Sequence, residues 1–271
     1  MSRIQIYYFS GTGNTAFIVN KIAEKLRLSG NEVNLSSCEE CKSIDHDFDV
    51  LGIAFPIHSS YAPKVFSSFL DKLPNKNATP LFGIVTSGYM AGDVLSFEGK
   101  RLERKGYIPF LYRNIIVGNN LHLPILCPLK VTKKQEINKR LIKIDNQIED
   151  IVKKIDNRSK DMRGNDLFGR LFGVLQRSIG KVHEELNFKG FSSDEKCTRC
   201  KWCIKSCPTN NIIFKDDKIV FENRCIICMR CYNFCPNKAI QMTNKTKNIT
   251  KYIRYDGPEG LGIRTMFNKN K

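Results

Sequence analysis

The chain has 271 residues, 41% of them hydrophobic, which is enough for one ordinary domain and a small one. It has no apolar signal region and no run of about 18 or more uninterrupted apolar residues, which argues against export and membrane spans and predicts a cytoplasmic protein. The formal net charge of +17 comes from scattered Lys and Arg residues without a nucleic-acid-binding motif. An acidic protein is therefore the favoured partner, and a merely lysine-rich surface is the plain alternative.

A β-rich apolar run at residues 3–9 is followed at once by a helix whose apolar residues keep helical spacing. The connecting loop consists of Ser10, Gly11, Thr12, Gly13, Asn14 and Thr15. At a helix N-terminus, free N–H groups, two glycines and three hydroxyls can satisfy a phosphate without any Lys or Arg. The loop lacks the Walker and dinucleotide signatures. It resembles the FMN-phosphate loop of flavodoxins, and this resemblance implies that the chain binds FMN.

The next segments alternate between strands and helices. Strands are expected at residues 32–36, 50–55, 80–86 and 108–117, and helices at residues 63–73 and 92–105. This alternation predicts a flavodoxin-like, doubly wound parallel sheet of five strands within a domain of residues 1–130. The ligand of such a sheet lies beyond the carboxyl ends of its strands.

Two further loops leave the sheet at that edge, and the resemblance to flavodoxins assigns them to the isoalloxazine ring. Tyr61 and Tyr89 are candidates to stack on the flavin, and the serines offer hydrogen bonds to its polar edge. His58 is interpreted as a satisfied loop histidine rather than an acid or base. The first loop comprises Pro56, Ile57, His58, Ser59, Ser60 and Tyr61, and the second contributes Thr86, Ser87, Gly88, Tyr89, Gly92 and Asp93.

Residues 131–189 contain two amphipathic helical patterns joined by a polar segment, residues 156–165. Their apolar seams predict a helical hairpin that links two domains and buries one helix against the other. The alternative is that residues 167–182, which include Arg170, Arg177 and Lys181, lie on a membrane surface.

Eight cysteines at residues 197–236 form two runs, each reading C-x2-C-x2-C-x3-C-P. Three thiolates of such a run reach one [4Fe–4S] cubane, while the fourth, before the proline, ligates the other. Paired zinc sites or a disulfide knot fit this spacing poorly. Cluster one is therefore assigned to Cys197, Cys200, Cys203 and Cys235, and cluster two to Cys225, Cys228, Cys231 and Cys207.

The two runs also form an internal repeat with a period of 28 residues, and a hairpin is expected at residues 212–221. Residues 190–244 resemble bacterial two-cluster ferredoxins. Residues 245–271 form a basic tail that is expected to wrap back or to be disordered. Cys38 and Cys41 remain outside the motif and are interpreted as free thiols. Cys127 precedes a proline as a cluster ligand does, but the count of eight ligands is already complete. Thiols and oxygen-sensitive clusters both indicate a reducing, anaerobic environment.

The chain thus resembles a bacterial family in which a flavodoxin is fused to a two-cluster ferredoxin. This resemblance implies an electron-transfer protein with FMN and two [4Fe–4S] clusters, in which no residue need act as acid, base or nucleophile. Two alternatives stay open: a flavin-dependent reductase that acts on a small substrate over the ring, and a membrane-docked redox subunit of a larger complex.

Overall fold

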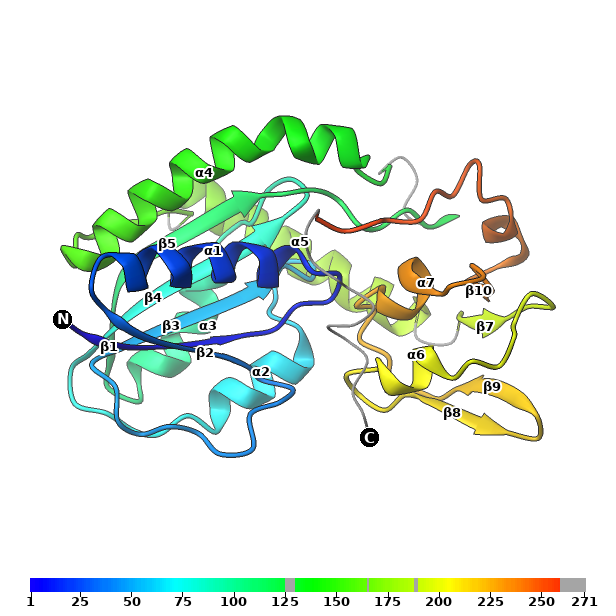
Figure 1. Ribbon diagram of the computed structural model, residues 1–271, viewed down its shortest axis with the longest axis horizontal. Helices are drawn as coiled ribbons and strands as arrows, with labels where there is room; N and C mark the ends of the chain where they lie inside the picture. The colour runs from blue at the N-terminus through cyan, green and yellow to red at the C-terminus, as the bar shows by residue number, and fades with distance from the viewer. Residues whose placement is uncertain (125–129, 165, 188–189, 259–271) are drawn as a thin grey trace. The chain divides into compact units, whose positions relative to one another are not determined.

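A computed structural model describes residues 1–124, 130–164, 166–187 and 190–258 of the chain (Figure 1). Cys127 lies outside the described residues. By its internal contacts the chain divides into two compact units. The first contains Met1–Ser10, Asn14–Val117 and Lys139–Gly180, and the second contains Gly11–Gly13, Gly118–Asn138 and Lys181–Lys271.

The first unit is built on a parallel sheet with the strand order β2-β1-β3-β4-β5-β6. The expected strands are confirmed as β1 (Arg3–Tyr8), β2 (Glu32–Ser37), β3 (Val50–Pro56), β4 (Thr79–Ser87) and β5 (Tyr107–Ile116). The sixth strand, β6 (Asp161–Met162), pairs with β5 and extends the sheet beyond the five strands expected. Two residues are too few to show the alternation by which a sequence indicates a strand. The order around β1 is that of flavodoxin-like sheets, whose ligand binds where the strand order reverses.

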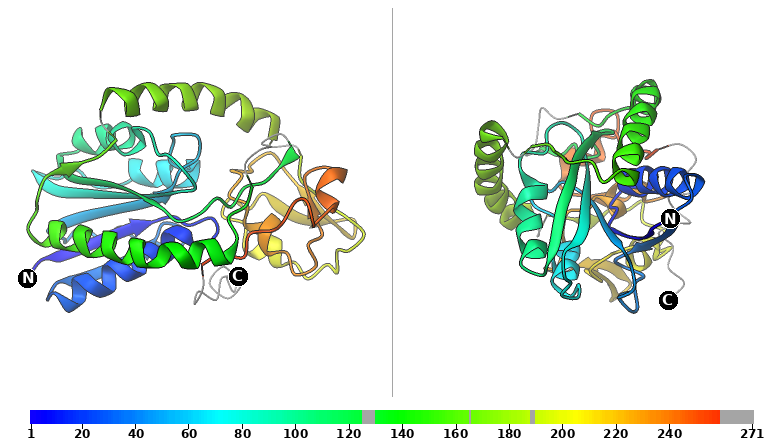
Figure 2. Two further views of the ribbon diagram at one scale, coloured as in Figure 1. Left: turned by 90° about the horizontal axis from the view of Figure 1, so that it is seen from above. Right: turned by 90° about the vertical axis from the view of Figure 1, so that its left-hand side faces the viewer.

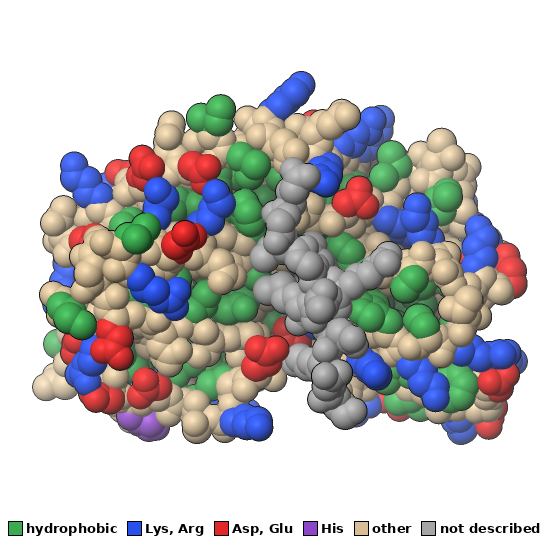
Figure 3. Space-filling model, viewed as in Figure 1, with side chains coloured by type: hydrophobic (Ala, Val, Ile, Leu, Met, Phe, Trp, Pro, Cys, Tyr) green, Lys and Arg blue, Asp and Glu red, His purple; other side chains and the backbone are tan. Residues whose placement is uncertain are grey.

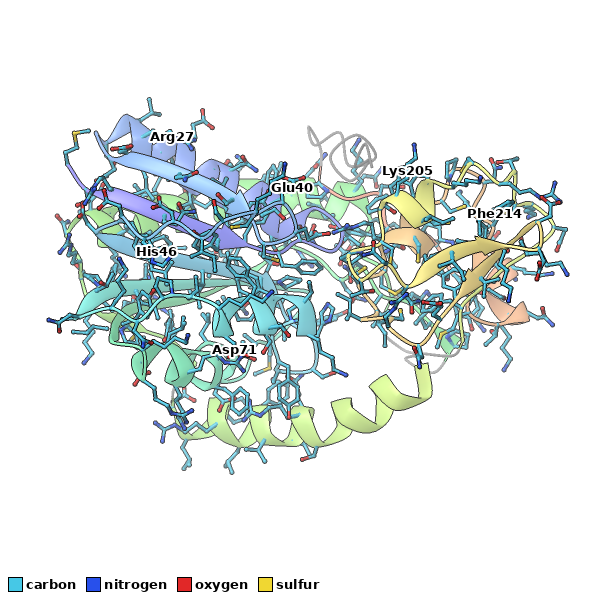
Figure 4. The ribbon with its side chains drawn as sticks, turned by 90° about the horizontal axis from the view of Figure 1, so that it is seen from below. Arg27, Glu40, His46, Asp71, Lys205 and Phe214 are labelled. Carbon is cyan, nitrogen blue, oxygen red and sulfur yellow. The ribbon has the colours of Figure 1, made fainter. Side chains whose placement is uncertain are left out.

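Helices cover both faces of this sheet, as the views in Figure 2 show. Helices α1 (Asn14–Leu28) and α4 (Lys134–Asp156) lie on one face, and α2 (Lys64–Asp71), α3 (Val94–Glu103) and α5 (Leu167–Asn187) lie on the other. On the second face, Asp71 at the end of α2, labelled in Figure 4, accepts a hydrogen bond of 3.0 Å from Arg101 of α3. The covered faces bury a core of aliphatic and aromatic side chains such as Ile6, Ile53 and Val85.

Helix α4 buries its apolar seam in the first unit and not against α5. Its isoleucines at positions 144, 148, 151 and 155 are buried. Ion pairs join it to neighbours on its own side of the sheet: Asp145 lies 2.7 Å from Lys21 of α1, and Asp150 lies 2.5 Å from the buried Arg113 of β5. The two amphipathic helices are therefore present, but the expected hairpin with a shared seam is not formed. A helical period shows which face is apolar, but not which element covers it.

Helix α5 leaves much of its apolar surface uncovered. Its buried positions are Gly169, Gly173 and Arg177, whereas its exposed side chains include five large apolar ones. These exposed residues are Leu167, Phe168, Leu171, Val174 and Leu175. Phe168 and Leu175 belong to the seam for which burial was expected. Phe172, which belongs to the same seam, is half-buried, and Ile179, Val182 and Leu186 lie outside the side chains that the structure describes.

The second unit contains short elements around the cysteine runs. They are β7 (Ser192–Ser193), α6 (Trp202–Lys205), β8 (Ile212–Lys215), β9 (Lys218–Phe221), α7 (Arg230–Phe234), β10 (Ile240–Gln241) and the 3-10 helix η2 (Asn244–Lys247). Strands β8 and β9 form the predicted antiparallel hairpin, and β7 pairs with β10. Phe214 of β8, labelled in Figure 4, lies 4.4 Å from the Nζ of Lys201, measured to the ring centroid.

The described part of the C-terminal segment folds back onto this second unit. Tyr252, Arg254 and Tyr255 are buried, and the backbone N–H of Tyr255 donates to the side chain of Asn233 over 3.0 Å. This outcome agrees with the first of the two expectations for the tail. Among the described residues, no helix is both long and apolar enough to cross a bilayer.

Candidate cofactor sites

The loop expected to bind phosphate connects β1 to the first turn of α1. Ser10, Thr12, Asn14 and Thr15 are all buried there. The Ser10 hydroxyl accepts a bond of 3.2 Å from the N–H of Ala16, and the Thr15 hydroxyl lies 2.8 Å from that of Thr86. The loop therefore has hydroxyls, backbone N–H groups and a helix N-terminus, but no Lys or Arg of its own. This donor set suits a dianionic phosphate ester such as that of FMN.

The middle of this loop, Gly11–Gly13, has its contacts within the second unit. The Thr12 hydroxyl accepts a bond of 2.6 Å from the amide of Asn120, which leaves the hydroxyl proton available to a phosphate oxygen. The carbonyl of Gly11 accepts a bond of 3.2 Å from Nε of Arg230. A Cβ at position 11 would lie 2.7 Å from the carbonyl oxygen of Cys228, so only glycine fits there.

The first expected ring loop is a tight turn after β3. His58 and Tyr61 exchange two backbone hydrogen bonds, of 3.0 and 2.8 Å, across Ser59 and Ser60. Both serines adopt left-handed conformations, with φ of 48° and 59°, which is the pattern of a type I′ turn. The turn thus reaches a conformation that usually requires glycine, although the loop contains none. Ile57 donates to the carbonyl of Thr86 over 3.1 Å, so the two ring loops start side by side.

The second ring loop follows β4. The Ser87 hydroxyl lies 2.9 Å from Oδ1 of Asn114 and 3.1 Å from the carbonyl oxygen of Tyr89. The Tyr89 side chain is half exposed, and Gly88 lies between these two residues. Gly92 adopts a φ of 60°, which brings its backbone close to the Ser60 hydroxyl.

A buried ion pair ties both ring loops to α5. Arg177 lies 2.5 Å from the Asp93 carboxylate, and its Nη1 also donates to the carbonyl of Ser60 over 3.4 Å. Its guanidinium lies 4.4 Å from the ring centroid of Phe97, and Tyr61 packs edge-on against the same ring at 5.5 Å. The Asp93 carboxylate, expected among the flavin contacts, is thus engaged by Arg177.

Arg177 was predicted as part of a possible membrane face and not as a residue that positions the loops. A signal was present, because Gly169, Gly173 and Arg177 recur at intervals of four and so share one helix face. Small residues on that face let α5 approach the loops closely. A Cβ at Gly173 would meet the Asp93 carboxylate at 1.9 Å.

In the second unit the eight motif cysteines divide between two cavities. One cavity is lined by Cys197, Cys200, Cys203 and Cys235, together with Trp202 and Pro236. The other is lined by Cys207, Cys225, Cys228 and Cys231, together with Met229 and Arg230. Each cavity combines three cysteines of one run with the last cysteine of the other run. These are the sets assigned above to cluster one and cluster two.

The backbone of the two runs repeats along with the sequence. Left-handed conformations occur at Arg199 and Lys201 in the first run and at Ile227 and Met229, 28 residues later, in the second. Backbone N–H groups point at the last cysteine of each run: Asn211 donates to Sγ of Cys207 over 3.2 Å, and Ala239 to Sγ of Cys235 over 3.3 Å. Such N–H donors favour a thiolate and stabilise the negative charge of an iron–sulfur cluster.

Burial favours the protonated form of the more deeply buried motif thiols when no metal is bound. It raises the pKa of Cys203 and of Cys228 to about 12 and that of Cys231 well above its ordinary value. At Cys228 the positive charge of Arg230 opposes this rise. Ligation by iron must therefore displace protons, which couples cluster binding to pH.

No three or more His, Cys, Asp or Glu side chains of the described residues converge as ligands of a single ion. Thiolates that bind different iron corners of a cubane need not converge in that way.

Comparisons with known proteins agree with this division of the chain. A model described as "Flavodoxin domain" matches residues 5–97, and one described as "4Fe-4S dicluster domain" matches residues 196–240. Together with the parallel sheet and the two cysteine cavities, they identify both parts of the fusion.

Individual relatives are more distant. The chain is 35% identical over 54 residues to an archaeal-type glutamate synthase [NADPH] of Dehalococcoides mccartyi, a match that covers 19% of this chain and only 11% of that protein. A Fusobacterium nucleatum flavodoxin bound to flavin mononucleotide is 15% identical with a TM-score of 0.42, covering 59% of this chain and all of the flavodoxin. A Megasphaera elsdenii flavodoxin is 22% identical with a TM-score of 0.38, covering 42% of this chain and 85% of the flavodoxin.

Proposed function

Because the chain joins an N-terminal flavodoxin domain to a C-terminal 4Fe-4S dicluster domain, we propose that it passes electrons between one FMN and two [4Fe–4S] clusters. The observation that carries the proposal is the division of eight cysteines into two cavities of four. When bound, FMN exchanges two electrons or one and each cluster exchanges one, so the chain would couple two-electron donors to one-electron carriers.

The residues of this chain would bind the cofactors and hold them in place. Ser10, Thr12 and Thr15 would donate to the phosphate, and the two ring loops would border the isoalloxazine ring. The buried pair of Asp93 and Arg177 would keep those loops fixed, since breaking a buried ion pair leaves an uncompensated charge. No side chain needs to move a proton in this role.

The partners that we propose are acidic redox proteins. The chain carries a formal net charge of +17, and on the face shown in Figure 3 its Lys and Arg side chains are scattered among acidic and neutral ones. A surface of this kind accelerates encounter with an acidic partner at low ionic strength. The proposed function is tested by the rate of electron exchange between the flavin and the clusters within one chain.

Docking to an anionic membrane surface is a second candidate role, and the exposed apolar face of α5 favours it. Leu167, Phe168, Leu171, Val174 and Leu175 are exposed together along this helix. Arg170 is exposed on the same helix, and the positive net charge complements anionic headgroups. An amphipathic helix with these properties lies in the interface of a bilayer.

We therefore expect the protein to co-sediment with phosphatidylglycerol vesicles and much less with phosphatidylcholine vesicles. Leu171→Asp with Val174→Asp should reduce binding about tenfold or more, because each charge would enter the apolar boundary. Ile142→Asp, at an exposed apolar position on α4, is the matched control and should bind as the unaltered protein does. Equal loss in the control, or equal binding to neutral vesicles, would rule out docking through α5.

A further inference from the structure

Arg254 is a buried arginine contributed by the segment that follows the cysteine motif. Its side chain is 5% exposed, and its Nη2 donates to the carbonyl of Ile240 over 2.9 Å and to Oε1 of Gln241 over 3.0 Å. Its Nε and Nη1 are buried and have no hydrogen-bond partner among the described residues. Burying unpaired N–H groups of a cation is costly, so this arrangement points to negative charge nearby, of which the Asp194 carboxylate is one source.

The positive charge of Arg254 interacts with Cys231, a ligand assigned to cluster two, although its hydrogen-bond acceptor Ile240 lines the cavity of cluster one. The guanidinium carbon lies 3.3 Å from the ring centroid of Tyr232, which directly follows the ligand Cys231. Burial lowers the pKa of Arg254 to about 10, and the charges of Asp194 and Cys231 oppose this fall, so the side chain stays charged at neutral pH.

Arg230 brings a second buried charge to the same cluster. It is 1% exposed, lies between Cys228 and Cys231 in the chain, and lines the cavity of cluster two. Its Nη1 donates to the carbonyl of Ser206 over 2.6 Å, which fixes the guanidinium beside the motif.

The internal repeat provides the comparison with cluster one. The residue 28 positions before Arg230 is Trp202, which is neutral. The positive residues of the first run are Arg199, Lys201 and Lys205. All three are exposed, and Arg199 is paired with Asp217 at 2.7 Å. The Coulomb interaction of a charge in water, where the dielectric constant is about 80, is about four times weaker than in a protein with an effective dielectric constant of about 20. The two clusters thus differ in buried positive charge.

From this asymmetry we propose that Arg254 and Arg230 raise the reduction potential of cluster two above that of cluster one, so that cluster two is reduced first. The inference rests on the proposed function, because it requires both clusters to be bound. Its physical basis is that reduction adds one negative charge to a cluster, and net charge and hydrogen bonds around the sulfurs set the potential. The C-terminal segment then affects the reduction potential of cluster two, in addition to packing against the second unit.

The test is an anaerobic redox titration, followed by electron paramagnetic resonance, of the intact protein and of Arg254→Met. Methionine keeps an unbranched side chain but removes the charge. We expect the higher of the two cluster potentials to fall by at least 59 mV, which is a tenfold change in the equilibrium constant of a one-electron couple, while the lower one stays. Arg254→Lys should restore most of the potential because it restores the charge.

Arg224→Met is the matched control, since Arg224 directly precedes the ligand Cys225 but its side chain is 56% exposed. It should leave both potentials unchanged. If Arg254→Met lost iron, Arg230→Met would be titrated for the same shift. The inference would be overturned if Arg254→Met holds both clusters but its higher potential does not fall. It would also be overturned if the higher potential falls equally in Arg224→Met. Absence of iron and acid-labile sulfide from the unaltered protein would instead refute the proposed function.

Discussion

Replacing Cys235 by alanine is expected to destroy cluster one, although Cys235 belongs to the second cysteine run. Its side chain lines the cavity of Cys197, Cys200 and Cys203. Iron should fall from about eight to about four atoms per chain, with an equal fall in acid-labile sulfide, because each cubane holds four of each. Iron and sulfide analysis of anaerobically purified protein measures this directly.

Double substitutions separate crosswise ligation from ligation within one run. Cys235→Ala with Cys203→Ala should lose no more iron than either change alone, because both remove ligands of one cluster. Cys235→Ala with Cys231→Ala should lose nearly all iron, because the two changes remove ligands of different clusters. Cys38→Ala with Cys41→Ala is the control and should retain about eight iron atoms. The opposite pattern of the two doubles would assign each cluster to a single run.

Replacing Thr12 and Thr15 together by alanine is expected to weaken FMN binding strongly while the clusters stay intact. Both hydroxyls are buried in the loop between β1 and α1. A hydrogen bond to a charged group contributes about 1.5–3 kcal/mol, so losing two should lower affinity by about a hundredfold or more. Flavin fluorescence titration measures the change, and iron analysis shows whether both clusters are retained.

Riboflavin, which lacks the phosphate, makes this test specific. The double variant should bind riboflavin about as well as the unaltered protein does, because the phosphate is the only part of FMN that the lost hydroxyls are expected to contact. Thr79→Ala, at the opposite end of β4 from Thr86, is the matched control and should bind FMN normally. The phosphate assignment fails if FMN affinity is unchanged, or if riboflavin affinity falls to the same extent.

Much of the fold follows from local patterns in the sequence. The strands around the Gly-rich loop were predictable because short apolar runs alternate with helical periods. The hairpin of β8 and β9 was predictable because Asp216 and Asp217 can adopt the left-handed conformations that its two-residue turn requires, with φ of 49° and 58°. The repeat of 28 residues predicted two equivalent half-modules, and the backbone conformations repeat at that interval.

The features that the sequence did not reveal depend on tertiary partners. The apolar face of α4 was visible, but its period does not show that it is buried in the first unit, where Lys21 and Arg113 form ion pairs with α4, rather than against α5. Arg254 carries no local mark of burial, because an arginine in a tail is usually solvated. The small residues that share a helix face with Arg177 indicate close packing there, but not which element it contacts. Only the positions of Asp93 and Tyr232 show that both arginines are buried beside candidate sites.

The central claim is that one chain carries electrons between FMN and its own clusters, and rapid mixing with a one-electron donor tests it most directly. Absorbance would follow flavin and clusters separately at protein concentrations that differ by about tenfold. A tether gives an effective concentration of order millimolar, so the account predicts an equilibration rate that does not change with protein concentration. A rate that rises in proportion to protein concentration would contradict it, because electrons would then pass between chains.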